Sequence, residues 1–277
     1  MSDLKQFNQM IVKPNTQEYL LSVLNTKKDQ FVNDLTALVA NDANLQACEP
    51  VTIMYAAIKA TALSLPLDKN LGFAYVIPYH NSKTKKTEAQ FQIGYKGLKQ
   101  LAIRSGQYKV INVTDVREGE LKQRDRRTGH VTVEWIEDNE ERNNRKIIGY
   151  LGYFALLNGY EKESYWSVKE LEEHGLRYSQ SYKKGYGLWK DDFRAMAEKT
   201  VLKLMLNKGD APLSVEMQQA VTFDQAVMYD PNTPEYRDNE PKSAQDAADE
   251  LMAEDVEYEG QPVGNDGTIP YDVKEEV

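Results

Sequence analysis

The chain contains 277 residues, with 43 Asp or Glu against 34 Lys or Arg, and therefore carries a formal net charge of −9. Its 41% apolar and 28% charged residues are typical of a globular protein of one or two domains, and no apolar run is long enough to span a membrane. The single cysteine, Cys48, excludes an internal disulfide and, with an N-terminus that lacks the apolar core of a secretion signal, favours a cytoplasmic setting.

The charge differs between the two ends of the chain. Residues 216–277 hold 17 acidic and 3 basic side chains, a net charge of −14, whereas residues 1–215 hold 26 acidic and 31 basic ones, a net charge of +5. Residues 231–277 also hold five of the ten prolines and few large aliphatic side chains, so they cannot bury enough apolar surface to become ordered. We therefore predict a folded domain over residues 1–225 and a largely disordered acidic tail over residues 226–277, which could bind a partner.

The first 65 residues show the apolar spacing of helices. Large side chains such as Leu20 and Phe31 recur at helical intervals, and the pattern breaks near residues 25–26. Pro50 stands where the first turn of a helix accepts proline, and the helix that it opens should end before Pro66.

The middle of the chain changes to strand patterns. Residues 71–79 and 90–95 are rich in aromatic and β-branched side chains and flank a polar, lysine-rich stretch, which predicts an exposed hairpin. Further strands are predicted over residues 108–116, 130–137 and 146–157.

Helical signals return in the C-terminal half. Ser167 followed by Glu170 is a capping-box pattern that opens a short helix. A long helix is predicted over residues 187–209 and another over residues 213–227. The sequence thus predicts an α+β fold with N-terminal helices, a central and mostly antiparallel sheet with a hairpin, a long C-terminal helix and the disordered acidic tail.

Patterns for several enzymatic chemistries are absent from the sequence. It has no GxxxxGK[ST] phosphate loop, and its three histidines and one cysteine lack metal-ligand spacing, so we expect no catalytic residue and no metal site. A metal-dependent nuclease stays open as an alternative, because Glu120 and Lys122 form an E-x-K pattern downstream of Asp115. The many charges around this pattern favour a solvated surface instead.

Two segments concentrate positive charge. Residues 83–109 hold seven basic side chains and one acidic one, and residues 177–208 hold eight and three. Both intersperse cations with aromatic and amide side chains, as single-strand binding requires, because cations follow phosphates while flat rings stack on bases of any sequence. In a helix over residues 95–105, Lys96 and Lys99 would share one polar face beside the helix start, where a phosphate is favoured.

The predicted DNA-binding side chains come from both segments. In the first they are Lys83, Lys85, Lys86, Gln92, Tyr95, Lys96, Lys99, Arg104 and Lys109. In the second they are Arg177, Tyr182, Lys183, Lys184, Tyr186, Lys190, Arg194, Lys199 and Lys203. Composition alone leaves an ordinary charged surface open as the alternative, and Trp189 and Phe193 are expected in the core rather than stacked on bases.

Three segments together resemble a known family. LGFAYVIPY, QFQIGYKGLKQLAIRSGQ and GLWKDDFRAMAEKTVLKLML occur in the order and spacing found in the RecT/Redβ family of phage single-strand annealing proteins, with the RecT branch most similar. The likeness covers residues 15–225, and Gln92, Tyr95 and Lys96 match the Gln-Ile-Gly-Tyr-Lys-Gly motif of the family.

The resemblance implies a recombinase that anneals DNA without ATP. Such proteins bind single-stranded DNA, pair it with a complementary strand, and form rings or helical filaments on the annealed duplex. The implied partners are a 5′→3′ exonuclease and the single-strand binding protein of a bacterial host cell, with no membrane and no required cofactor. Modulation by Mg²⁺ is left open. The sequence alone also leaves open a non-catalytic adaptor that recruits replication proteins through its tail.

Overall fold

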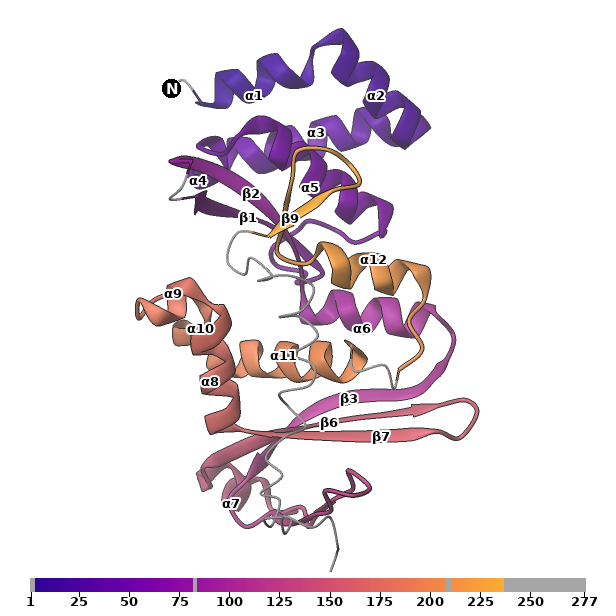
Figure 1. Ribbon diagram of the computed structural model, residues 1–277, viewed down its shortest axis with the longest axis vertical. Coiled ribbons are helices and arrows are strands. Elements are labelled where there is room, and N and C mark those ends of the chain that lie inside the picture. Colours follow the sequence, from indigo (N-terminus) through magenta and orange to yellow (C-terminus); the bar gives the residue numbers. More distant parts are fainter. Residues whose placement is uncertain (1–2, 82–83, 208–210, 237–277) are drawn as a thin grey trace, which may run out of the picture. The chain divides into compact units, whose positions relative to one another are not determined.

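The structure is a computed structural model that describes residues 3–81, 84–207 and 211–236 (Figure 1). Helices at the N-terminus precede antiparallel sheets and further helices, which confirms the predicted α+β class. The part of the predicted tail beyond residue 236 lies outside the described residues. No helix within the described ranges is long and apolar enough to cross a membrane.

The N-terminal helices follow the predicted breaks. Their bounds are α1 (Asp3–Ile11), α2 (Pro14–Leu24), the 3₁₀ turn η1 (Asn25–Lys27), α3 (Lys28–Ala40), α4 (Ala43–Gln46) and α5 (Pro50–Ala62). The break at Asn25 is a residue with φ of 48°, in the left-handed region that asparagine tolerates better than most side chains. Pro50 occupies the first turn of α5, as its missing N–H allows.

The first sheet joins strands from opposite ends of the folded chain. Its antiparallel order is β1 (Ala74–Asn81), β2 (Lys86–Ile93), β8 (Ala226–Met228) and β9 (Pro234–Tyr236). The predicted hairpin is confirmed by β1 and β2. The buried strand β8 corrects two expectations, because helix α12 (Val215–Phe223) ends before it and because residues 226–236 belong to the folded part rather than to the tail.

The second sheet has the order β3 (Tyr108–Arg117), β6 (Ile147–Leu156) and β7 (Glu161–Ser167), and a separate ribbon pairs β4 (Leu121–Arg124) with β5 (Val131–Val133). The strands therefore divide among three sheets instead of one. Neither β4, β7 nor the short helix α7 (Asn139–Asn144) was predicted. Strands β4 and β7 are polar edge strands, in which the apolar alternation of a half-buried strand is weak, and α7 has no buried residue to mark a helical face.

Helix α6 (Tyr95–Arg104) lies between β2 and β3, and the later helices are α8 (Val168–Tyr178), α9 (Gln180–Lys183), α10 (Leu188–Asp191) and α11 (Phe193–Asn207). The capping box of Ser167 and Glu170 is confirmed at the start of α8. The single long helix predicted over residues 187–209 is wrong at Asp192, where φ of −142° and ψ of 71° break it. The Asp192 carboxylate accepts a hydrogen bond from the Ala195 N–H at 3.1 Å, so it caps α11 instead of continuing α10.

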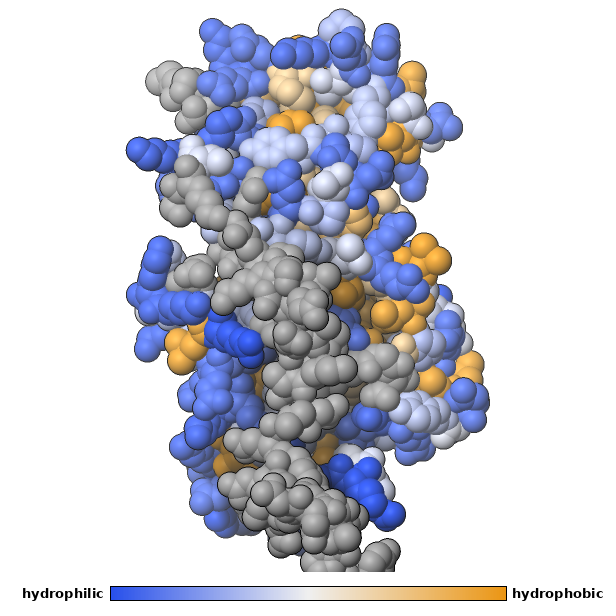
Figure 2. Space-filling model, viewed as in Figure 1, coloured by the Kyte–Doolittle hydropathy of each residue, from blue (hydrophilic) through white to orange (hydrophobic). Residues whose placement is uncertain are grey.

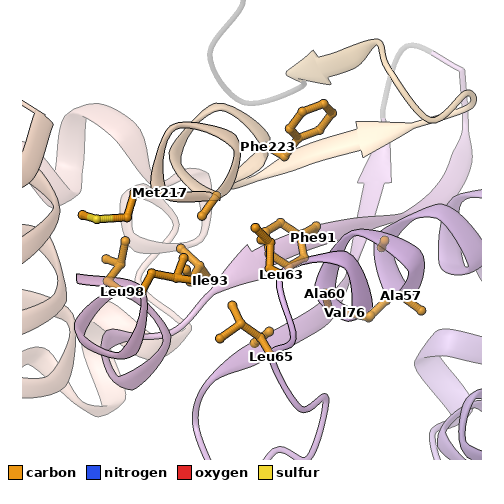
Figure 3. Packing of buried hydrophobic residues seen from close by; sticks show 14 of the residues in the cluster. Ala57, Ala60, Leu63, Leu65, Val76, Phe91, Ile93, Leu98, Met217 and Phe223 are labelled. Atoms are coloured by element: carbon orange, nitrogen blue, oxygen red, sulfur yellow. The ribbon is translucent and has the colours of Figure 1, made fainter. Parts of the chain in front are cut away.

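One main hydrophobic core holds the elements together, with α6, α11 and α12 lying between the two larger sheets (Figure 1). Figure 3 shows Ala57 of α5, Val76 of β1 and Phe91 of β2 on one side of the first sheet, while Met217 of α12 lies beside Leu98 of α6. On the other side of α11, a Cβ atom at Gly152 would lie 3.0 Å from the Met205 sulfur. The second sheet thus packs closely against α11.

Candidate nucleic-acid interface

The Gln-Ile-Gly-Tyr-Lys-Gly segment forms the junction between β2 and α6. Gly94 is the N-cap of α6 and donates its N–H to the Phe73 carbonyl oxygen at 2.9 Å. A Cβ atom at Gly94 would lie 2.1 Å from the carbonyl oxygen of Gly72, and one at Gly97 would lie 2.1 Å from that of Phe73. Only glycine permits this backbone approach, which fixes the start of α6 against residues 72–73.

Helix α6 presents the two faces that its sequence predicts. Leu98, Leu101 and Ala102 are buried, whereas Lys96 is exposed and Lys99 is partly exposed. The Lys99 ammonium lies 6.0 Å from the ring centre of Tyr95. Neither lysine has an acidic partner among the described residues, and the start of a helix favours an anion, so this end of α6 is suited to a phosphate.

The two tyrosines near this junction have different environments. Tyr95 packs against the main core, and burial followed by the charge of Glu198 raises its pKa. Tyr75 is not part of that core: it pairs with Gln92 across β1 and β2, and its ring would lie 3.1 Å from a Cβ at Gly94. Tyr95 is therefore mainly a packing residue, and Tyr75 is the half-buried aromatic side chain beside the motif.

Tyr75 also adjoins Lys96, which sequence reasoning missed. A Cβ atom at Gly72 would lie 3.3 Å from the Tyr75 hydroxyl oxygen and 3.7 Å from Cδ of Lys96, so both side chains flank the same glycine. Strand alternation in the sequence could have indicated its position, because Tyr75 lies on the face of β1 opposite to the buried Val76. We call Tyr75, Gln92, Lys96 and Lys99 the α6 surface.

The remaining predicted residues of the first segment lie elsewhere. The rise of a strand, about 3.3 Å per residue, places Lys86 about 23 Å from the end of β2 at Ile93, and Lys86 pairs with Glu49 at 2.8 Å. Lys85 is exposed at the same far end and Lys109 is exposed at the start of β3. The side chains that do not join the α6 surface are Lys85, Lys86, Arg104 and Lys109, and Lys83 lies outside the described residues.

Arg104 has structural partners at the C-terminal end of α6. Its guanidinium donates to the Leu63 carbonyl oxygen at 2.6 Å and lies 3.5 Å from the Glu216 carboxylate. These contacts connect α6 to the end of α5 and the start of α12. Arg104 is thus already engaged in holding the fold.

Lys199 and Lys203 differ most from their predicted role. The Lys203 ammonium donates to Asp224 at 2.6 Å, and the Lys199 ammonium lies 3.9 Å from the same carboxylate, whose side chain is fully buried. Asp224 also accepts the Ile93 N–H at 3.0 Å. A buried carboxylate therefore neutralises both lysines, which the sequence predicted as DNA contacts, and ties α11 and the end of α12 to β2.

The pKa values of this cluster follow from its geometry. Burial would raise the pKa of Asp224, but Lys199, Lys203 and the Ile93 N–H together hold it below its usual value. Burial lowers the pKa of Lys199, and Asp224 opposes that change. The three charges therefore depend on one another inside the protein.

The α8–α10 region retains most of the available charge of the second segment. Lys183, Lys184 and Lys190 are exposed and have no acidic partner in the described ranges, and Tyr186 is 57% exposed. Figure 2 shows mainly hydrophilic side chains over this region. We call these four residues the α8–α10 surface. Exposed Arg177 lies near them in sequence, at the end of α8.

Local packing orders the cationic turn that sequence composition suggested was loose. Tyr182 stacks on Trp189 with ring centres 5.8 Å apart, and Trp189 meets Phe193 edge to face at 5.6 Å. Trp189 is buried, as expected for a core residue. A Cβ at Gly175 would lie 2.9 Å from the Trp189 ring, so α8 approaches α10 closely at this glycine.

The carboxylates considered for a nuclease form an ion network. Asp115 accepts from Arg117 at 2.9 Å and lies 3.3 Å from Arg142 and 3.2 Å from Arg194. The fully buried Glu120 accepts from Arg142 at 2.6 Å. Burial would raise the pKa of both acids, but these arginines lower it. Both carboxylates are paired with arginine side chains. Within the described ranges, no group of His, Cys, Asp or Glu residues could hold a metal ion.

This network also links the two basic segments. Arg194, which is 57% exposed, bonds both Asp115 and Glu198 of its own helix, and Glu198 lies near Tyr95 of α6. Helices α6 and α11 therefore pack together where the two segments meet. Arg194 remains at the surface but carries little unpaired charge.

Comparisons with known proteins show what the chain is similar to. A model described as the RecT family matches residues 29–243. The chain is 36% identical over 270 residues to the uncharacterised protein YqaK of Bacillus subtilis (strain 168), covering 95% of this chain and 90% of that protein. It is 26% identical over 219 residues to protein RecT of Escherichia coli (strain K12), covering 78% of each.

Proposed function

Because this chain belongs to the RecT family, we propose that it anneals complementary single strands of DNA without ATP and without breaking a covalent bond. The observation that supports this most directly is the α6 surface. There Lys96 and Lys99, which have no acidic partner in the described ranges, stand with Tyr75 and Gln92 at the start of a helix. This combination suits a phosphate and a base at adjacent positions.

The proposed mechanism needs only binding and alignment. Lysines of the α6 and α8–α10 surfaces neutralise the phosphates of one strand, so that a second strand can approach it with less repulsion. Pairing then releases on the order of 1.4 kcal/mol per base-pair step, which makes annealing favourable without nucleotide hydrolysis. In this proposal the protein assembles into rings or helical filaments on the annealed duplex, and it receives single strands from a 5′→3′ exonuclease and a host single-strand binding protein in the bacterial cytoplasm.

A fluorescence-quench assay with two labelled complementary oligonucleotides and no nucleotide tests the activity. We expect annealing faster than the spontaneous rate, with or without Mg²⁺. If the strands anneal no faster with the protein than without it, the proposal is contradicted and a non-catalytic adaptor is favoured. Protein-dependent cleavage of labelled strands in Mg²⁺ or Mn²⁺ would instead show a nuclease.

The double variant Lys96→Ala/Lys99→Ala tests the site. Removing two phosphate contacts should weaken single-strand binding by about 1–3 kcal/mol and reduce the salt slope by about two charges. Lys5→Ala/Lys13→Ala is the matched control, because Lys5 of α1 and Lys13 at the N-cap of α2 are exposed and lack acidic partners among the described residues. Equal salt slopes for the two double variants would show that the α6 surface does not contact DNA.

A further inference from the structure

The first sheet has a second face that does not pack on the main core. In the register of β1 and β2, Tyr75 pairs with Gln92, Ile77 with Gln90 and Tyr79 with Glu88. Because paired residues in an antiparallel sheet share a face, these six side chains lie together. The intervening residues, including Val76, Phe91 and Ile93, point into the core (Figure 3).

The aromatic and aliphatic members of this second face are only partly covered. Tyr75, Ile77 and Tyr79 are half-buried, and none of them belongs to or packs against the main core. Side chains two residues apart along β1 are separated by about 7 Å. The face therefore offers a row of flat and branched apolar groups that begins beside Lys96.

Gln90 lies within this row and has an unused donor. Its side chain is buried, with 3% of the residue exposed, and its Nε2 has no hydrogen-bond partner in the described part of the protein. Buried polar groups are paired in more than about 90% of cases, so an orphaned amide indicates a missing partner. Gln92, two residues further on, brings a second carboxamide to the same face.

We propose that this second face receives the nucleobases of single-stranded DNA, with Tyr75 as the stacking ring, Gln90 and Gln92 as donors to base edges, and Lys96 as the contact to the adjoining phosphate. The inference rests on the proposed function and adds where the bases lie. Aromatic rings accept any base, and carboxamides can match both donors and acceptors on base edges. An apolar peptide would fit the row less well, because Lys96 and the start of α6 favour an anion at its end.

A comparison of two strands of equal length, one with bases and one abasic, tests this site. The wild-type protein should bind the base-bearing strand more tightly. Tyr75→Leu should reduce that preference about tenfold while leaving the salt slope unchanged, because it removes stacking and no charge. Tyr75→Phe keeps the ring and should keep the preference. Tyr160→Leu, at a tyrosine that is 41% exposed in the turn between β6 and β7, is the matched control.

Gln90→Leu provides a variant that should fold. It removes an unpaired buried donor, so the midpoint of thermal unfolding should stay equal or rise while the preference for bases falls. If both Tyr75→Leu and Gln90→Leu keep the full preference, or if the wild type binds both strands equally, the inference is overturned but the proposed function stands. If the wild type binds neither strand, the proposed function itself fails.

Discussion

Replacing Asp224 with asparagine should destabilise the folded domain strongly. The exchange keeps the size of the side chain and can keep the hydrogen bond from the Ile93 N–H, but it removes the charge that lies 2.6 Å from Lys203 and 3.9 Å from Lys199. The Lys199 side chain is 12% exposed, so its charge cannot be well solvated in place. Removing one partner of such a buried pair costs about 3–5 kcal/mol.

Urea denaturation followed by circular dichroism measures this cost. The matched control is Asp29→Asn, because Asp29 also pairs with a lysine, at 3.2 Å, but is 87% exposed. Water screens that pair, so the control should unfold at the wild-type urea concentration. The same preparations should be tested for single-strand binding, where Lys199→Met and Lys203→Met should retain the wild-type salt slope as long as they are folded.

Two results would refute the reasoning. An Asp224→Asn protein as stable as the Asp29→Asn control would mean that the buried cluster does not hold α11 and α12 to β2. Alternatively, folded Lys199→Met and Lys203→Met proteins with reduced salt slopes would show that both lysines contact DNA.

Three further predictions concern the junction, acid stability and the tail. Gly97→Ala should leave little soluble protein, because the added Cβ atom would lie 2.1 Å from the Phe73 carbonyl oxygen. A variant as soluble as the wild type would contradict this close approach. Folding lowers the pKa values of Asp115 and Glu120, so their contribution to stability should be complete above about pH 5 and decline below about pH 4. The midpoint of thermal unfolding measures this decline, and equal midpoints at about pH 7 and about pH 3 would contradict it. Deleting residues 237–277 removes a net charge of −10 and should tighten single-strand binding if the tail competes with DNA, whereas unchanged affinity would argue against competition.

Local signals predicted much of the fold. The hairpin of β1 and β2, the break at Asn25 and the capping box of Ser167 were all foreseeable because each depends on residues close together in sequence. The faces of α6 were foreseeable for the same reason, since helical geometry alone determines which side chains share a side. The break at Asp192 was missed because the apolar spacing of Trp189, Phe193 and Ala197 continues across it, and only the cap reveals it.

Contacts between distant residues set the limit of prediction for the site. Lys199 and Lys203 look like a cationic helix face until Asp224, more than 20 positions away in sequence, is placed between them and β2. Tyr75 looks like an ordinary strand residue until Gly72 and Gly94 bring it beside Lys96. Composition shows how many charges a segment holds, but only tertiary packing determines which of them are neutralised.

The position of β8 in the first sheet affects how the protein is made. Strand β2 is synthesised long before Ala226–Met228, and the N–H of its last residue, Ile93, can donate to the Asp224 carboxylate only after that late segment has been made. Such long-range pairing is slow to form and leaves a strand edge open during synthesis. A chain still on the ribosome therefore has an incomplete first sheet, and the junction between β2 and α6 becomes fixed only after nearly all of the folded part has emerged.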